Sequence, residues 1–165
     1  MKSFDWNGLA LLPQRAAFRD DTLAQFTGWR ARRAGLRIKL IAGNHDIRAG
    51  LAPAALDLDW VGEPHDLDGL VCRHIPAEFD DSSGRPTLAG HWHPVARLYG
   101  PGRDSLRLPC FLMRPRRLVL PAFGEFTGGA TFDPDEDVAL CATAGGRLVH
   151  LPARRRRTAQ AHLSR

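Results

Sequence analysis

The chain has 165 residues, 44% of them hydrophobic, and carries a formal net charge of +5 at pH 7. This length fits one domain that can bury a core. No apolar run approaches the roughly 20 residues that a membrane-spanning helix needs, and the N-terminus lacks the apolar region of a signal peptide. The composition therefore predicts a cytoplasmic protein with no membrane segment, and the positive charge favours polyanionic partners.

The N-terminal quarter of the chain predicts a hairpin, a helix and a strand. Asn7-Gly8 is a two-residue turn signal within a short hairpin at 4–12. A helix is expected at 22–34, because an apolar stripe runs along it and Gly35 suits its C-terminal end. The strand expected at 36–42 has apolar residues that do not alternate with polar ones. That pattern is typical of a strand buried on both faces and paired on both edges.

The remainder of the chain predicts mostly strands. A loop or short helix is expected at 48–56, and Gly145-Gly146 suggests a hairpin turn. A four-arginine run marks residues 152–165 as a basic, disordered tail, which leaves 1–151 as the domain. The three cysteines have no metal-binding spacing and are expected as buried thiols in a reducing compartment. Strands are expected at 58–61, 67–74, 86–89, 95–99, 106–113, 117–121, 137–142 and 146–151.

Polar side chains follow the strand at 36–42 directly. Gly43 permits a sharp turn at its end, and Asn44, His45 and Asp46 come next. In open α/β sheets, ligands lie just beyond the carboxyl ends of strands. These three side chains, which can bind metal or move protons, are therefore candidates for the functional site.

Two histidine segments repeat this arrangement further along the chain. His74 ends an apolar run, and His91 and His93 follow a short apolar segment and Gly90. Histidine nitrogen and amide oxygen suit Mn, Fe or Zn better than Ca or Mg. A lone histidine such as His74 is, in other contexts, more often a hydrogen-bonding residue than a ligand. Trp92 is expected to pack in the core, because it points opposite to its two neighbours in an extended segment.

In this order, the GNHD, single-histidine and GHxH motifs resemble the second half of the signature of calcineurin-like metallophosphoesterases. Residues 103–111 and 120–129 resemble the C-terminal half of one branch, the bacterial ligase-associated DNA damage response endonucleases. Residues 6–16 resemble the extreme N-terminus of the same branch. Apart from the segment at 6–16, the resemblance extends over most of residues 19–150.

The resemblance implies an α/β fold, in which a calcineurin-like β-sandwich is flanked by helices in four layers (α/β/β/α). It also implies a metal-dependent phosphodiesterase or endonuclease of DNA repair, with DNA as substrate and a DNA ligase or helicase as repair partners. Such enzymes use two divalent metal ions to activate a water and neutralise charge on the phosphate. Manganese is the expected ion, with iron or zinc as alternatives.

The resemblance also assigns roles to individual residues. The metal ligands it implies are Asn44, His74 and His91 for one ion, and His93 for the other. His45 would stabilise the transition state or protonate the leaving oxygen, and Asp46 would orient its ring.

The DxH and GD motifs that begin the family signature are not in this chain. Their place corresponds to two βαβ-sized units of about 30 residues each, so the fold is expected to be incomplete. Without the bridging carboxylate, activity is expected to be weakened or lost, with one metal bound rather than two. The alternatives are a non-catalytic module that binds metal or nucleic acid, and a non-functional truncated gene product. An unpaired edge on strand 36–42 would be covered by the hairpin at 4–12 or would cause self-association.

Overall fold

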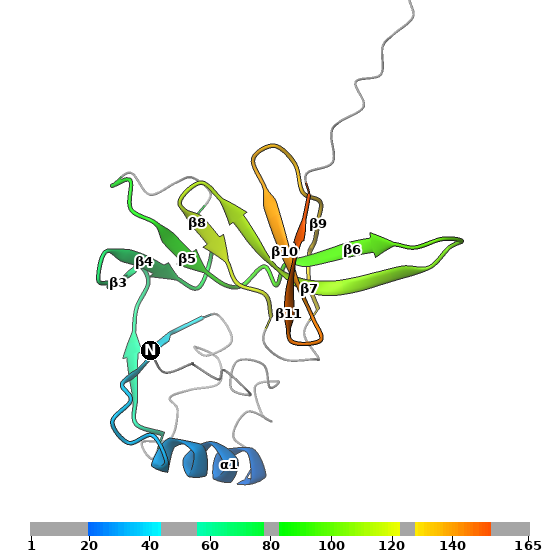
Figure 1. Cartoon of the computed structure of the whole chain (residues 1–165). Helices are drawn as coiled ribbons and strands as arrows, with labels where there is room; N and C mark the ends of the chain where they lie inside the picture. Colours follow the sequence, from blue (N-terminus) through cyan, green and yellow to red (C-terminus); the bar gives the residue numbers. More distant parts are fainter. Residues whose placement is uncertain (1–19, 44–55, 78–82, 123–127, 153–165) are drawn as a thin grey trace, which may run out of the picture.

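The structure is a computed structural model that describes residues 20–43, 56–77, 83–122 and 128–152 (Figure 1). Three of the predicted segments lie almost entirely outside these ranges. They are the hairpin at 4–12, the loop or short helix at 48–56, and the basic tail at 152–165.

The N-terminal part of the described chain contains α1 (Asp20–Ala31), β1 (Ile38–Ile41) and β2 (Leu58–Val61). The predicted helix is present, but it begins and ends earlier than expected. Arg33 N and Leu36 N donate to the carbonyls three residues before them, at 2.8 and 2.9 Å, so the chain tightens into turns after Ala31. Within the described ranges, no helix has the length and apolar character needed to cross a membrane.

Strand β1 is expected to be paired on both edges, but among the described residues it pairs only with β2, in a two-stranded parallel sheet. Its side chains are half-buried, apart from the exposed Lys39. The docking of the 4–12 hairpin on this strand stays a prediction, because that segment lies outside the described residues.

Helix α1 is joined to the start of β2 by an ion pair, and aromatic contacts form along the helix itself. Phe26 and Trp29 stack with ring centroids 5.5 Å apart, and the Arg33 guanidinium lies 4.7 Å from the Trp29 ring centroid. Arg30 is only 7% exposed and forms an ion pair with Asp57, just before β2. A buried guanidinium needs a compensating charge, and Asp57 supplies it, so this pair links the helix to β2.

The C-terminal part forms a larger sheet in the order β11-β10-β7-β8-β5-β4-β3, to which β6 and β9 are joined through β7. Neighbours β4, β5 and β8 are parallel, whereas β7 is antiparallel to β6, β8 and β10. Figure 1 shows β6 and the first half of β7 extending away from the rest of this sheet. The strands are β3 (His65–Leu67), β4 (Leu70–Arg73), β5 (Thr87–Ala89), β6 (Val95–Tyr99), β7 (Ser105–Arg114), β8 (Arg117–Val119), β9 (Thr131–Phe132), β10 (Ala139–Ala144) and β11 (Arg147–Leu151).

Two strand predictions are corrected. The single strand expected at 67–74 is a hairpin of β3 and β4, because Asp68 and Gly69 take positive φ values of 52° and 88° and reverse the chain. Strand β9 was not expected at all. The other predicted strands are present with small shifts at their ends, and Gly145-Gly146 forms the predicted turn with φ values of 54° and 73°.

The core lies where β6, β7, β8 and β10 meet. Trp92 packs against it, as predicted, and stacks on Phe132 with centroids 5.9 Å apart. Cys72 and Cys110 are buried free thiols, as expected, whereas Cys141 is half-buried. Burial, with a smaller contribution from the nearby Cys141, raises the pKa of the Cys110 thiol to about 11. The core residues are Ala96, Cys110, Leu112, Val119, Val138, Leu140 and Ala142.

Candidate functional site: a histidine pair at the ends of two parallel strands

The candidate site forms where β4 and β5 end. These strands are parallel, with Arg73 opposite Ala89, so the residues that follow them emerge at the same edge of the sheet. Gly90 N donates to the carbonyl of His74 at 3.1 Å, which continues the ladder by one step. His74 and His91, which are seventeen residues apart in the chain, are therefore brought to one place by these two strands.

The two imidazole rings are in direct contact. His91 Nδ1 lies 3.0 Å from His74 Nε2, and the rings meet edge to face with centroids 4.8 Å apart. Both side chains are half-buried. Metal–imidazole bonds are about 2.1 Å long, so two nitrogens bound at a right angle to one ion are separated by about 3.0 Å. The observed separation fits a shared divalent ion, and it equally suits an N–H···N hydrogen bond between the rings.

The end of β1 lies against the same pair. A Cβ atom placed on Gly43 would be 2.5, 2.6 and 2.8 Å from Cε1, Nδ1 and Nε2 of His74. The His74 ring therefore rests directly on the Gly43 backbone, in space that any other residue would fill. The three residues after Gly43, namely Asn44, His45 and Asp46, lie outside the described residues, so their predicted roles stay predictions.

The loop that carries His91 has an unusual backbone. His91 and His93 have positive φ values of 65° and 47°. Trp92 N donates to Gly90 O at 2.8 Å, a bond across the single residue His91 that has the form of a γ-turn. Positive φ is uncommon outside glycine and costs free energy, and such residues concentrate at functional sites. This turn fixes the direction in which the His91 ring leaves the strand.

Glu63 supports the backbone at His74. Its Oε2 accepts hydrogen bonds from the amides of His74 and Ile75, at 2.6 and 3.1 Å. The sequence analysis did not select Glu63. One signal was available, because Glu63 comes two residues after the predicted strand at 58–61, where ligand-binding residues are expected. The carboxylate fixes the chain direction after β4 and so orients His74.

In the part of the chain that the structure describes, there is no group of three His, Cys, Asp or Glu side chains that could hold a metal ion. His93 follows His91 by two residues, and its predicted role as a ligand of a second ion stays a prediction. The site that the described residues define is thus two imidazoles supported by Gly43 and Glu63.

The fold class predicted from the sequence is confirmed: the chain is a mixed α/β protein, mostly sheet, with the fold of a nuclease, consistent with the calcineurin-like fold. A solved structure to which it is similar is that of nuclease MPE from Pseudomonas putida, with a TM-score of 0.68 and 42% identity. The match covers 83% of this chain and 64% of the nuclease chain, so this chain spans less than two thirds of that protein. No protein-family profile matches the sequence, and no curated protein does.

Proposed function

We propose that the chain is a metal-dependent phosphodiesterase that cleaves nucleic acid. The observation that carries this proposal is the contact between His74 and His91 at the joined ends of β4 and β5, 3.0 Å apart. The chain that places them there is 42% identical to a nuclease over 83% of its length. Two imidazoles aimed at one point form a donor set for Mn, Fe or Zn.

The described residues would bind one divalent ion and hold it in place. His74 Nε2 and His91 Nδ1 are the donors, and each must be unprotonated to bind. A bound ion would act as a Lewis acid that polarises a phosphoryl oxygen. Gly43 and Glu63 are positioning residues, because one supports the His74 ring and the other its backbone.

The motifs that match the ligase-associated endonucleases support a more specific proposal. We infer that the substrate is DNA, that the metal is manganese with iron or zinc as alternatives, and that the chain acts in DNA repair in the cytoplasm beside a ligase or helicase. Asn44 would complete the first metal site. His93 would serve a second ion, and His45 with Asp46 would assist the leaving group.

Activity is expected to be weak, because a two-metal mechanism needs a carboxylate that bridges the ions and the DxH and GD motifs are not in the sequence. A second candidate function is a non-catalytic module that binds metal or nucleic acid. It is favoured by the lack of the DxH and GD motifs in the sequence, because two histidines can bind an ion without the bridging carboxylate that two-metal hydrolysis needs. Both the phosphodiesterase and a metal-binding module would take up metal, but only the phosphodiesterase would cleave nucleic acid.

The test uses the full chain, loaded with Mn²⁺, and measures both metal content by mass spectrometry and cleavage of end-labelled DNA. His91→Ala removes one donor, and His150→Ala is the matched control because His150 is an exposed histidine on β11. We expect uptake of one equivalent and slow cleavage, both lost in His91→Ala and kept in His150→Ala. Uptake without cleavage would favour the binding module, and no uptake would refute the metal site.

A further inference from the structure

The β6–β7 arm, defined as residues 95–109, extends from the histidine loop. Its first strand begins at Val95, directly after the loop with His91 and His93. At its base, β9 pairs with Val95 and Ala96, which makes the arm three-stranded there. Beyond Ala96 the arm has only its two own strands among the described residues, and Figure 1 shows it projecting from the sheet. At about 3.3 Å per residue, β6 carries the arm roughly 15 Å from the loop.

One face of this arm carries two neighbouring arginines. Arg97 on β6 lies directly opposite Arg107 on β7, and both are exposed. Side chains in such a cross-strand pair have Cβ atoms about 5 Å apart, and like charges there destabilise the sheet. Among the described residues neither arginine forms an ion pair. Arg107 donates one hydrogen bond, to Gly129 O at 3.1 Å, and a guanidinium has five N–H donors.

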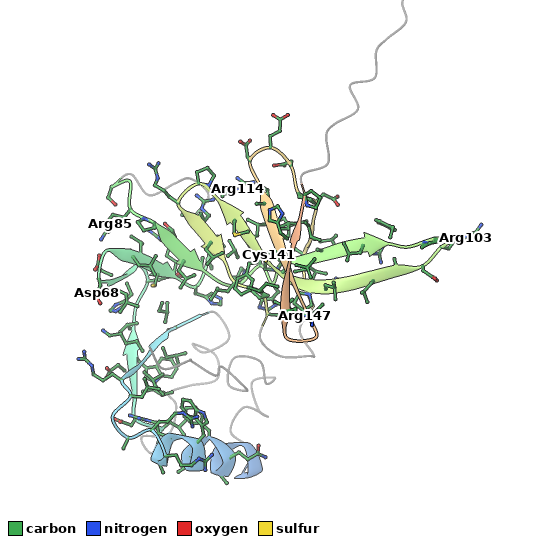
Figure 2. The ribbon with its side chains drawn as sticks, in the orientation of Figure 1. Asp68, Arg85, Arg103, Arg114, Cys141 and Arg147 are labelled. Atoms are coloured by element: carbon green, nitrogen blue, oxygen red, sulfur yellow. The ribbon has the colours of Figure 1, made fainter. Side chains whose placement is uncertain are left out.

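An aromatic ring lies on the same face. Tyr99 follows Arg97 by two residues, so both point to one side of β6, and Tyr99 is 62% exposed. Arg103 stands at the tip of the arm (Figure 2). A row of exposed arginines beside an exposed aromatic ring is the combination by which proteins hold nucleic-acid strands, with arginine on phosphates and the ring on a base.

We propose that the β6–β7 arm binds a nucleic-acid strand outside the histidine site, through Arg97 and Arg107 on its phosphates and Tyr99 on an unpaired base. This rests on the proposed function and adds a surface that leads the strand toward His91. The repulsion between Arg97 and Arg107 in the free chain is offset when a phosphate lies between them, so the pair is suited to an anionic ligand.

The test measures binding separately from cleavage. The full chain is titrated in EDTA against a fluorescein-labelled thymidine 20-mer, and anisotropy is recorded from 50 to 200 mM salt. Each phosphate contact on a single strand contributes about 0.7 to the slope of log K against log salt. We expect Arg97→Ala/Arg107→Ala to lower the slope by about 1.4 and the affinity about 25-fold at 0.1 M salt.

The matched control is Arg37→Ala/Arg114→Ala, which removes the same charge from exposed sites outside the arm. The control should keep the slope within experimental error of the parent chain. Tyr99→Ala should weaken binding by about 5- to 150-fold, whereas Tyr99→Phe should retain it because the ring still stacks. Circular dichroism melts must show that each variant is folded before its affinity is compared.

Each outcome decides a separate point. Equal losses in the arm and control variants, or displacement of the 20-mer by equimolar polyglutamate, would overturn the arm as a nucleic-acid surface. If the arm variants bind the 20-mer as well as the parent chain and the parent chain still cleaves DNA, the arm is not the binding surface and the nuclease proposal stands. Arm-dependent binding by a chain that cleaves no phosphodiester would support the arm and refute the nuclease.

Discussion

Replacing Gly43 by alanine should displace the His74 ring. The added Cβ would lie 2.5 Å from Cε1 of that ring, whereas ordinary contact begins at 3.4 Å. The ring must therefore shift by about 1 Å, which would disturb the 3.0 Å contact between His74 Nε2 and His91 Nδ1. A shift of this size costs about 100-fold in turnover, and loss of a ligand's support costs about 10- to 100-fold in metal affinity. Because the ring is half-buried and can move outward, the stability cost should be small, about 1 kcal/mol.

Calorimetric titration with Mn²⁺ measures the affinity directly, and a urea melt measures the stability. Gly35→Ala is the control, because a Cβ at Gly35 meets no atom within 4 Å and its φ is not positive. We expect Gly43→Ala to lose at least tenfold in affinity while Gly35→Ala stays at the parent value. Unchanged affinity in Gly43→Ala would refute the inference that the Gly43 backbone holds His74 in its ligand position.

Three further predictions concern stability and reactivity. Glu63→Gln should lower the free energy of unfolding by about 0.5–1.5 kcal/mol in a urea melt, because its hydrogen bonds to the His74 and Ile75 amides lose their charge; an unchanged midpoint would contradict this. Leu140→Ala, at a fully buried site, should cost about 2–5 kcal/mol, and a loss below 1 kcal/mol would place Leu140 outside the core. The pKa of the Cys110 thiol is raised from 9.0 to about 11 in the folded chain. The contribution of this buried thiol to the free energy of unfolding is therefore complete below pH 9.0 and is lost as the pH rises through 11. Mass spectrometry after iodoacetamide at pH 9 should find Cys110 alkylated only in denaturant.

Most of the sheet could be predicted because its strands have strong local signals. Each predicted strand had a run of β-branched or aliphatic residues bounded by turn residues, and the structure retains these runs. The prediction at 67–74 was wrong because the apolar residues on either side of Asp68-Gly69 resemble one continuous strand. The Asp-Gly pair is a strong turn signal and reverses the chain there. Strand β9 has only Thr131 and Phe132, and its pairing with β6 is parallel and distant in sequence, so no local pattern indicated it.

The candidate site was predictable where it depends on strand ends and unpredictable where it depends on contacts between distant segments. His74 and His91 could be expected together, because both follow apolar runs and parallel strands end at one edge. The contact of Gly43 with the His74 ring and the bond from Glu63 to the His74 amide could not be predicted. Both depend on how the β1–β2 sheet lies against the end of β4, which no periodicity in the sequence encodes.

Strand β7 is one continuous strand with two very different surroundings. From Cys110 to Arg114 it pairs with β8 and β10, whereas from Ser105 to Leu108 its one partner among the described residues is β6. Pro109 stands at the boundary and has no amide hydrogen to donate. Amide exchange along this strand should therefore change abruptly, from rates set by global unfolding to rates set by local opening of the arm. We therefore expect the outer part of the arm, from Arg97 to Arg107, to open and close while the core, which includes Ala96, stays folded.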